Sequence, residues 1–79
     1  MEDFLWIDFN LQKIDNHGLS ADEVENAWQK RRDIARRIHA VNGPYTESQG
    51  TCPSGRVIKI IWRYNDGLNG REIFIITAY

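Results

Sequence analysis

The chain has 79 residues and a formal net charge of −1, and 42% of its residues are hydrophobic while 27% are charged. These values are typical of a globular protein, and the length leaves room for one domain, residues 1–79, without a separate cofactor-binding domain. A single cysteine, Cys52, excludes an intramolecular disulfide and a paired-cysteine zinc site, which favours a reduced, cytoplasmic location. No apolar run approaches the roughly 18 residues that span a bilayer, so we expect no membrane role.

Charge is distributed unevenly along the sequence. The first 28 residues carry seven acidic residues and one basic residue, whereas residues 29–63 carry eight basic and two acidic residues. A basic segment inside a nearly neutral chain can attract phosphate or an acidic partner, because local potential steers encounter. The alternative is a basic surface that only keeps the protein soluble, and charge alone leaves both interpretations open.

The N-terminal residues predict a short strand followed by a short helix. Aromatic and β-branched residues at 3–9 favour the strand. Residues 10–17 carry two apolar side chains three positions apart and are followed by Gly18, a residue typical of helix ends. We therefore expect a helix that begins at Asp8 or Asn10.

A capping box predicts where the second helix begins. The Ser20 hydroxyl can accept from the backbone N–H of Glu23, and the Glu23 side chain can return to the backbone N–H of Ser20. Periodicity leaves the end of this helix open, because it either extends to about Ile38 or ends near Lys30, with residues 34–41 forming a strand.

The C-terminal half predicts strands joined by turns. Residues 42–44 (Asn-Gly-Pro) are a turn signal, and the polar, glycine-containing stretch 46–55 favours a loop or an edge strand. Residues 57–64 alternate along the chain and predict a strand with one apolar face, while Lys59 and Arg63 lie on the other face.

The last elements complete an antiparallel sheet. Residues 65–70 supply a hairpin-type turn, and residues 71–78 predict the returning strand. That strand offers an edge for pairing with another chain unless it lies inside the sheet. The predicted fold class is α+β, with an N-terminal strand and two short helices packed on a twisted antiparallel sheet.

Strong catalytic signatures are absent from the sequence. It contains no glycine-rich phosphate loop, no paired cysteine ligands and no G-x-S-x-G motif, so we expect neither a metal nor a cofactor. His17 precedes Gly18 and suits a structural role at a helix end. His39 follows Arg36 and Arg37, and neighbouring cations favour the neutral imidazole that a general base requires.

Basic residues around the predicted 57–64 strand are candidates for phosphate binding. Lys59 and Arg63 are about 13 Å apart on one sheet face at roughly 3.3 Å per residue, a separation that suits two phosphate contacts. Arg56 comes just before the strand, where a guanidinium can clamp a phosphate through two hydrogen bonds. Cations together with groups that move a proton are enough to cleave RNA without a metal. The alternative is that these cations only keep an open sheet face soluble.

The order of several short motifs resembles a known family. Residues 6–23 contain the motif W-x-D-x-N-x-x-K-x-x-x-H-G-x-S-x-x-E. It is followed by S-G-R at 54–56 and by I-I-T-A at 75–78. Over nearly the whole chain this order is similar to the BrnT-type toxins of the RelE-like superfamily. The resemblance implies a compact α+β RelE-like fold, a ribonuclease activity that stops translation, and an antitoxin encoded nearby. It also favours a strand over residues 32–38.

Two functions follow as expectations. The first is the toxin component of a type II toxin–antitoxin system, a metal-independent endoribonuclease that inhibits translation. Its catalytic residues would be Arg56, Lys59, His39 and Lys13, of which the resemblance matches Lys13 and Arg56, and its RNA-binding residues would be Arg63, Arg36 and Arg37.

The alternative function is a non-catalytic, truncated RelE-like domain that acts as a protein interaction module. The family usually continues past the last strand into a basic segment, whereas this sequence ends at Tyr79. The expected partners are RNA, a cognate antitoxin and a second copy of the chain bound through an edge strand.

Overall fold

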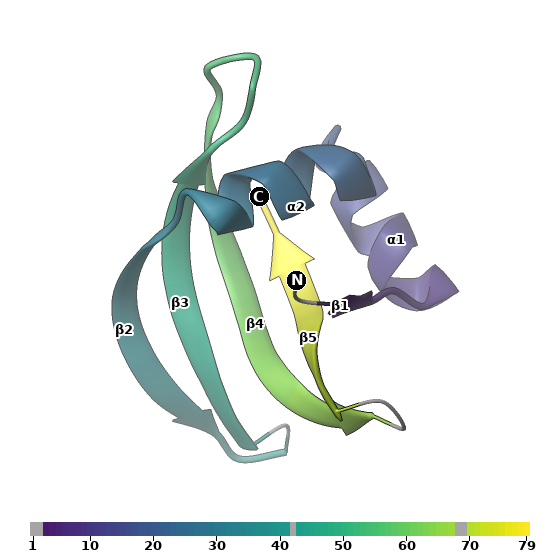
Figure 1. Ribbon diagram of the computed structural model, residues 1–79, viewed down its shortest axis with the longest axis vertical. Helices are drawn as coiled ribbons and strands as arrows, with labels where there is room; N and C mark the ends of the chain where they lie inside the picture. Colours follow the sequence, from purple (N-terminus) through teal and green to yellow (C-terminus); the bar gives the residue numbers. More distant parts are fainter. Residues whose placement is uncertain (1–2, 42, 68–69) are drawn as a thin grey trace.

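The computed structural model describes residues 3–41, 43–67 and 70–79, and within them two helices pack on one face of a five-stranded sheet (Figure 1). The elements in chain order are β1 (Asp3–Leu5), α1 (Asp8–Asp15), α2 (Ala21–Gln29), β2 (Arg32–His39), β3 (Gly43–Thr51), β4 (Val57–Gly67) and β5 (Gly70–Ala78). The strand order is β1-β5-β4-β3-β2, antiparallel from β5 to β2, with β1 added parallel to β5. The predicted α+β fold class is confirmed.

Local signals set where both helices begin. α1 begins at Asp8, one of the two predicted starts, although the preceding Ile7 supplies no side-chain cap. The predicted capping box is present, because Ser20 Oγ accepts from the Glu23 backbone N at 3.3 Å and Glu23 Oε1 accepts from the Ser20 backbone N at 3.1 Å. Between the helices, Gly18 has φ +73°, a left-handed conformation that glycine adopts without strain.

The residues after α2 form a strand, so of the two alternatives left open by periodicity the helix that ends near Lys30 is correct, and the strand favoured over residues 32–38 is confirmed. β2 pairs antiparallel with β3 from Arg32 opposite Gln49 to His39 opposite Gly43. The side chain of Ile38 is 83% exposed, so it contributes nothing to a buried helix stripe. Pairing with β3 instead satisfies the backbone groups of this arginine-rich segment that point toward β3.

Most of the polar stretch 46–55 is an interior strand, so its prediction as a loop or an edge strand is wrong. β3 lies between β4 and β2, and the connecting loop begins only at Cys52. Ser48 is fully buried, and its hydroxyl donates a hydrogen bond to Asp33 and accepts one from Trp62. A Cβ at Gly50 would overlap the backbone carbonyl of Ala27, so glycine lets α2 approach the strand. Small and polar residues therefore occupy an interior strand without an apolar pattern.

β1 pairs with β5 at Glu72–Phe74, and Asn10 Nδ2 donates to the carbonyls of Ile75 and Ile76, so β5 is not the free edge strand that residues 71–78 could have formed. β1 pairs with one side of β5 and β4 with the other, which leaves β1 and β2 as the outer strands of the described sheet. The β4–β5 pairing continues to Gly67 and Gly70, so this connection is shorter than predicted. Asn42, Leu68 and Asn69 of the predicted turns lie outside the described residues.

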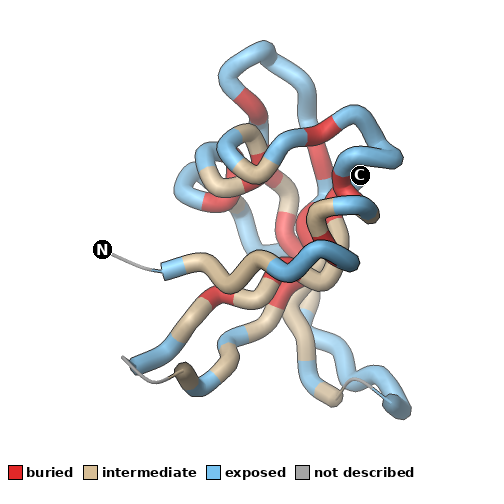
Figure 2. The backbone as a smooth tube through the Cα atoms, turned by 90° about the vertical axis from the view of Figure 1, so that its right-hand side faces the viewer, coloured by how far each residue is buried: buried red, intermediate tan, exposed pale blue. Residues whose placement is uncertain are grey.

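The hydrophobic core lies between the helices and one end of the sheet. Val24, Ala27 and Trp28 of α2 pack with the buried face of β4, whose Ile58, Ile60 and Trp62 alternate inward as predicted. Figure 2 shows buried residues gathered in the middle of the molecule and exposed residues at the hairpin ends. Neither helix in the described ranges is long and apolar enough to cross a membrane. The helices do not cover the whole of this sheet face, because Tyr64, two residues beyond Trp62 on β4, is 41% exposed.

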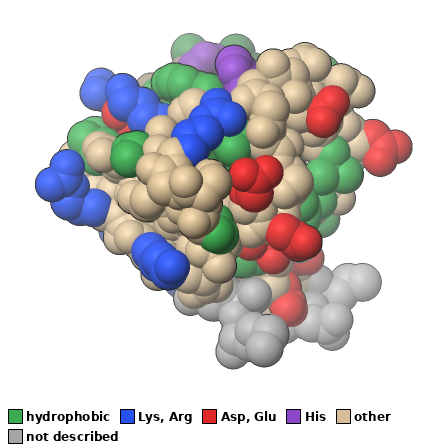
Figure 3. Space-filling model, turned by 90° about the horizontal axis from the view of Figure 1, so that it is seen from above, with side chains coloured by type: hydrophobic (Ala, Val, Ile, Leu, Met, Phe, Trp, Pro, Cys, Tyr) green, Lys and Arg blue, Asp and Glu red, His purple; other side chains and the backbone are tan. Residues whose placement is uncertain are grey.

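Charge is separated in space as it is along the sequence. Figure 3 shows Lys and Arg gathered on the side of the strands and Asp and Glu on the side of the helices. The acidic helix residues are Asp8, Asp15, Asp22, Glu23 and Glu25. A polyanion is therefore attracted to the strands and repelled by the helices.

Candidate functional site

The sheet divides into two arms at the end that the helices leave uncovered. β3 and β4 pair as far as Thr46 and Trp62. The β2–β3 pairing continues to His39 and Gly43, and the β4–β5 pairing continues to the other hairpin end. The two hairpins therefore diverge, as Figures 1 and 2 show. We call the hollow between these arms the fork.

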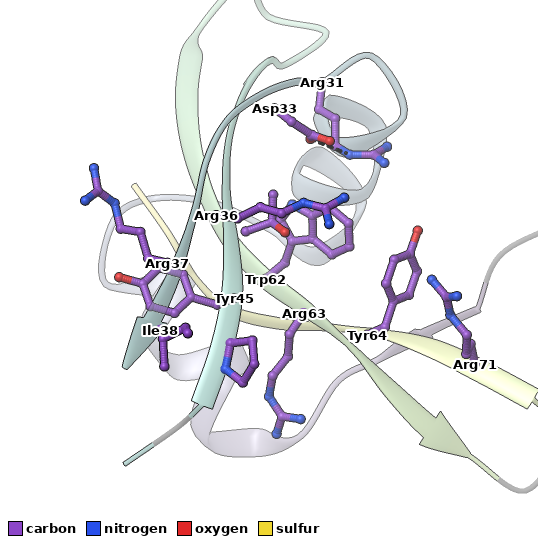
Figure 4. A pocket seen from close by; sticks show the side chains of 12 residues that line it. Arg31, Asp33, Arg36, Arg37, Ile38, Tyr45, Trp62, Arg63, Tyr64 and Arg71 are labelled. Atoms are coloured by element: carbon purple, nitrogen blue, oxygen red, sulfur yellow. Dashed lines mark hydrogen bonds and ion pairs between the residues drawn. The ribbon is translucent and has the colours of Figure 1, made fainter. Parts of the chain in front are cut away.

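The fork has a volume of about 730 Å³, and residues from both arms line it (Figure 4). The lining contains five arginines and one carboxylate residue, with four aromatic or aliphatic side chains from the two arms and two further β3 residues, Pro44 and Thr46. The arginines are Arg31, Arg36, Arg37, Arg63 and Arg71, the carboxylate is Asp33, and the remaining side chains are Ile38, Tyr45, Trp62 and Tyr64. This surplus of guanidinium groups favours an anionic ligand.

The lining carboxylate is already engaged by its neighbours. Asp33 Oδ1 accepts from Arg31 Nε at 3.1 Å and from Ser48 Oγ at 2.7 Å. Ser48 Oγ in turn accepts from Trp62 Nε1 at 2.9 Å. This chain of hydrogen bonds orients the Trp62 ring and compensates part of the Asp33 charge. The electrostatic repulsion between Asp33 and a bound anion is therefore weaker.

A column of aromatic rings extends from the core into the fork. Trp28 and Trp62 meet edge to face with ring centroids 5.2 Å apart, and Trp62 and Tyr64 meet in the same way at 5.0 Å. The Arg31 guanidinium lies 3.8 Å from the Trp28 ring centroid, and the Arg71 guanidinium lies 3.6 Å from that of Tyr64. Cation–π contacts thus hold two guanidinium groups beside planar rings, an arrangement that suits a ligand with both phosphates and flat bases.

The three predicted RNA-binding residues all line the fork. Arg36 and Arg37 come from β2, and Arg63 comes from β4. Arg63 lies over the Phe74 ring at 4.9 Å and donates to Asn65 Oδ1 at 3.3 Å, while its buried Nε has no hydrogen-bond partner.

The structure does not bring the four predicted catalytic residues together, and none of them lines the fork. Lys13 lies on α1 with its Nζ 4.8 Å from the Phe9 ring centroid. Arg56 is exposed in the β3–β4 loop, at the opposite end of β4 from the fork. His39 is exposed at the end of β2, where its Nδ1 accepts a hydrogen bond from the Val41 backbone N at 3.1 Å.

Lys59 forms an ion pair on the sheet face away from the helices. Its Nζ is 3.7 Å from Glu47 Oε2, and Arg37 Nε is 3.6 Å from Glu47 Oε1. The Glu47 side chain is only 15% exposed, so it neutralises part of the charge of both cations. Lys59 therefore offers less net charge to a phosphate than its position on the strand predicts.

Sequence reasoning missed the contribution of Arg31, Arg71, Trp62 and Tyr64. The alternation of residues 57–64 puts both rings on the apolar face of the predicted strand. Trp62 is buried there, whereas Tyr64 is 41% exposed because the helices end short of it. The signal that was available is W-R-Y at 62–64, where a cation stands between two aromatic residues. Nothing in the local pattern indicates that β3 and β4 separate at this point.

Cys52 lies outside the fork and is buried. Burial raises the pKa of its thiol, the Glu23 carboxylate raises it further, and Arg56 acts in the opposite direction. The thiol is therefore neutral at ordinary pH, and we assign it no chemistry.

No family model matches the chain, and no curated protein or solved structure is significantly similar to it. Fold and site together define a small α+β domain whose divided sheet holds a basic, aromatic fork. The similarity to BrnT-type toxins stays a prediction from the sequence motifs.

Proposed function

We propose that the protein binds RNA in the fork and acts in the cytoplasm as the toxin of a type II toxin–antitoxin system, as a metal-independent endoribonuclease that inhibits translation. The observation that carries this proposal is the fork itself, whose lining combines five arginines with Trp62 and Tyr64, and in which Arg31 and Arg71 lie directly over these two rings. Guanidinium groups bind phosphate oxygens in pairs, and exposed aromatic rings stack on unpaired bases. The motif resemblance supports the finer assignment to a toxin and its antitoxin partner.

The fork also holds groups suited to cleavage of an RNA phosphodiester. The 2′-hydroxyl would lose its proton to water and attack phosphorus, and the guanidinium groups of Arg36 and Arg71 would stabilise the charged phosphorane that forms. The P–O5′ bond would then break and leave a 2′,3′-cyclic phosphate. The Tyr64 hydroxyl, on the ring that Arg71 covers, would give a proton to the leaving 5′-oxygen. We therefore move the proton-transfer role from His39 to Tyr64.

Induced expression in bacteria tests this function. The parent chain, an Arg36→Ala/Arg71→Ala variant and a control Lys30→Ala/Arg32→Ala variant are compared for growth and for RNA integrity in the same cultures. The control loses two exposed cations that do not line the fork. We expect growth arrest and RNA loss with the parent and the control, and normal growth with the fork variant.

An Arg56→Ala/Lys59→Ala variant separates the fork from the site predicted by sequence. If this variant loses toxicity while Arg36→Ala/Arg71→Ala keeps it, the fork is not the site. If none of the soluble proteins slows growth or degrades RNA, the ribonuclease assignment is wrong.

The second candidate function, a non-catalytic interaction module, is favoured by a different feature. β2 is an outer strand of the described sheet and pairs with β3 alone. An open strand edge is a template for pairing with another chain. This function predicts a stable protein complex without RNA cleavage in the cultures described above.

A further inference from the structure

The outer edge of β2 has an accepting stretch at Ala35–Ile38. The register of β2 on β3 shifts between Asp33 and Ala35, so Ile34 is an extra residue that interrupts the edge. From Ala35 to His39 each residue has one partner on β3 in unbroken register, and within the described residues no strand pairs with the outer side of β2. Backbone groups that point outward along this stretch can pair with an added strand.

The side chains along this stretch indicate which residues an added strand should have. Arg36 and Arg37 are exposed and project to opposite faces of the sheet, because successive strand residues alternate. Ile38 follows them with a side chain that is 83% exposed. Directly opposite residues on paired strands interact, so two adjacent acidic residues and one apolar residue would match this edge.

A second copy of the chain fits this edge poorly. Two-fold pairing centred on Ala35–Ile38 places Arg36 and Arg37 opposite the same two arginines of the other copy. Like charges directly opposite each other destabilise a strand pair. Asp33, the acidic residue on β2, lies beyond the interruption and is held by Arg31 and Ser48.

We propose that the outer edge of β2 at Ala35–Ile38 binds an acidic, extended polypeptide segment as an additional strand. The segment carries two adjacent carboxylate residues against Arg36 and Arg37 and an apolar side chain against Ile38. Main-chain hydrogen bonds supply affinity, and the charges and the apolar contact supply register. This inference is independent of whether the fork cleaves RNA.

A synthetic peptide of about eight residues, an ordinary strand length, tests the inference. The probe is a threonine-rich peptide with Val-Glu-Glu at its centre, and the controls replace Glu-Glu by Lys-Lys or methylate the backbone nitrogens. Amide hydrogen exchange of the full chain is followed by NMR with each peptide. We expect new protection within Ala35–Ile38 with the Glu peptide, and at least about tenfold weaker binding of both controls.

Charge reversal on the protein provides the matched experiment. Arg36→Glu/Arg37→Glu should prefer the Lys peptide to the Glu peptide, whereas Arg36→Lys/Arg37→Lys should keep the preference of the parent. Absence of new protection at Ala35–Ile38 with the Glu peptide overturns the inference. So does protection of these amides by self-association, seen as a dimer in sedimentation of the chain alone.

Discussion

At the scale of single residues, Tyr64 connects the core to the fork. Its ring continues the aromatic column that begins at Trp28, and the Arg71 guanidinium covers it at 3.6 Å. Arg71 covers one face of a ring that is 41% exposed, so a base would stack on the other face of a side chain that is already held in place. Binding and proton transfer are therefore separable functions of this residue, one belonging to the ring and the other to the hydroxyl.

Substitution of Tyr64 should separate the two functions. Tyr64→Ala should weaken binding of single-stranded RNA by at least about fivefold, since one base–aromatic stack contributes about 1–3 kcal/mol. Tyr64→Phe should keep the affinity and lose cleavage. Fluorescence anisotropy and gel analysis of the cleaved RNA measure the two effects.

Phe9→Ala is the control for Tyr64, because Phe9 is an exposed aromatic residue on α1 outside the fork. It should change neither affinity nor cleavage. Full activity of Tyr64→Phe would remove the hydroxyl from the mechanism while leaving the stacking role intact.

At the scale of elements, the close approach of α2 to β3 builds one wall of the fork. Gly50 has no side chain at the point where the strand meets the backbone of Ala27. Two residues earlier on β3, Ser48 holds Asp33 and Trp62 in place. The distance between helix and strand therefore determines where Arg31, which follows α2, lies over the rings of Trp28 and Trp62.

Gly50→Ala should destabilise the protein through this contact. The added methyl group would overlap the Ala27 carbonyl, and overpacking of this kind costs about 1–3 kcal/mol. The midpoint of urea unfolding, compared with that of the parent, measures the loss. Thr51→Ala, at the exposed next position of β3, should unfold close to the parent. Equal midpoints for Gly50→Ala and the parent would show that α2 and β3 can separate at no cost.

At the scale of the whole molecule, the separation of charge orients the protein toward a polyanion. The helices carry five of the eleven acidic residues, and the divided end of the sheet carries five arginines. A protein with a net charge of −1 can therefore still present a basic surface to RNA.

RNA affinity should fall steeply with salt. Each phosphate contact to a single strand contributes about −0.7 to the slope of log K against log salt concentration, so three or four arginine contacts predict a slope of about −2 to −3. Arg36→Ala/Arg71→Ala should reduce the magnitude of this slope by about 1.4. Titrations of a single-stranded RNA at several NaCl concentrations measure it, and an unchanged slope in the variant would place the phosphate contacts elsewhere.

Part of the fold could be predicted because its signals are local. The capping box of Ser20 and Glu23 acts within one helical turn, and the alternation of residues 57–64 follows from the two faces of a strand. The interior position of β3 could not be predicted, because Gly50 and Ser48 are suited to neighbours that are distant in sequence, the Ala27 backbone and the Trp62 side chain. The same limit applied to β5, because only long-range pairing with β1 places it inside the sheet.

The same distinction between local and long-range signals applies to the candidate site. The sequence by itself determined the charge dipole, the α+β class and the membership of Arg36, Arg37 and Arg63 in a basic surface, because composition and strand alternation are local properties. Only the tertiary structure decided that these arginines line one hollow with Arg31, Arg71, Trp62 and Tyr64, and that Arg56 and Lys59 do not line it. The physical reason is that β3 and β4 stop pairing at Thr46 and Trp62, and the separation of two hairpins depends on contacts between residues far apart in the chain.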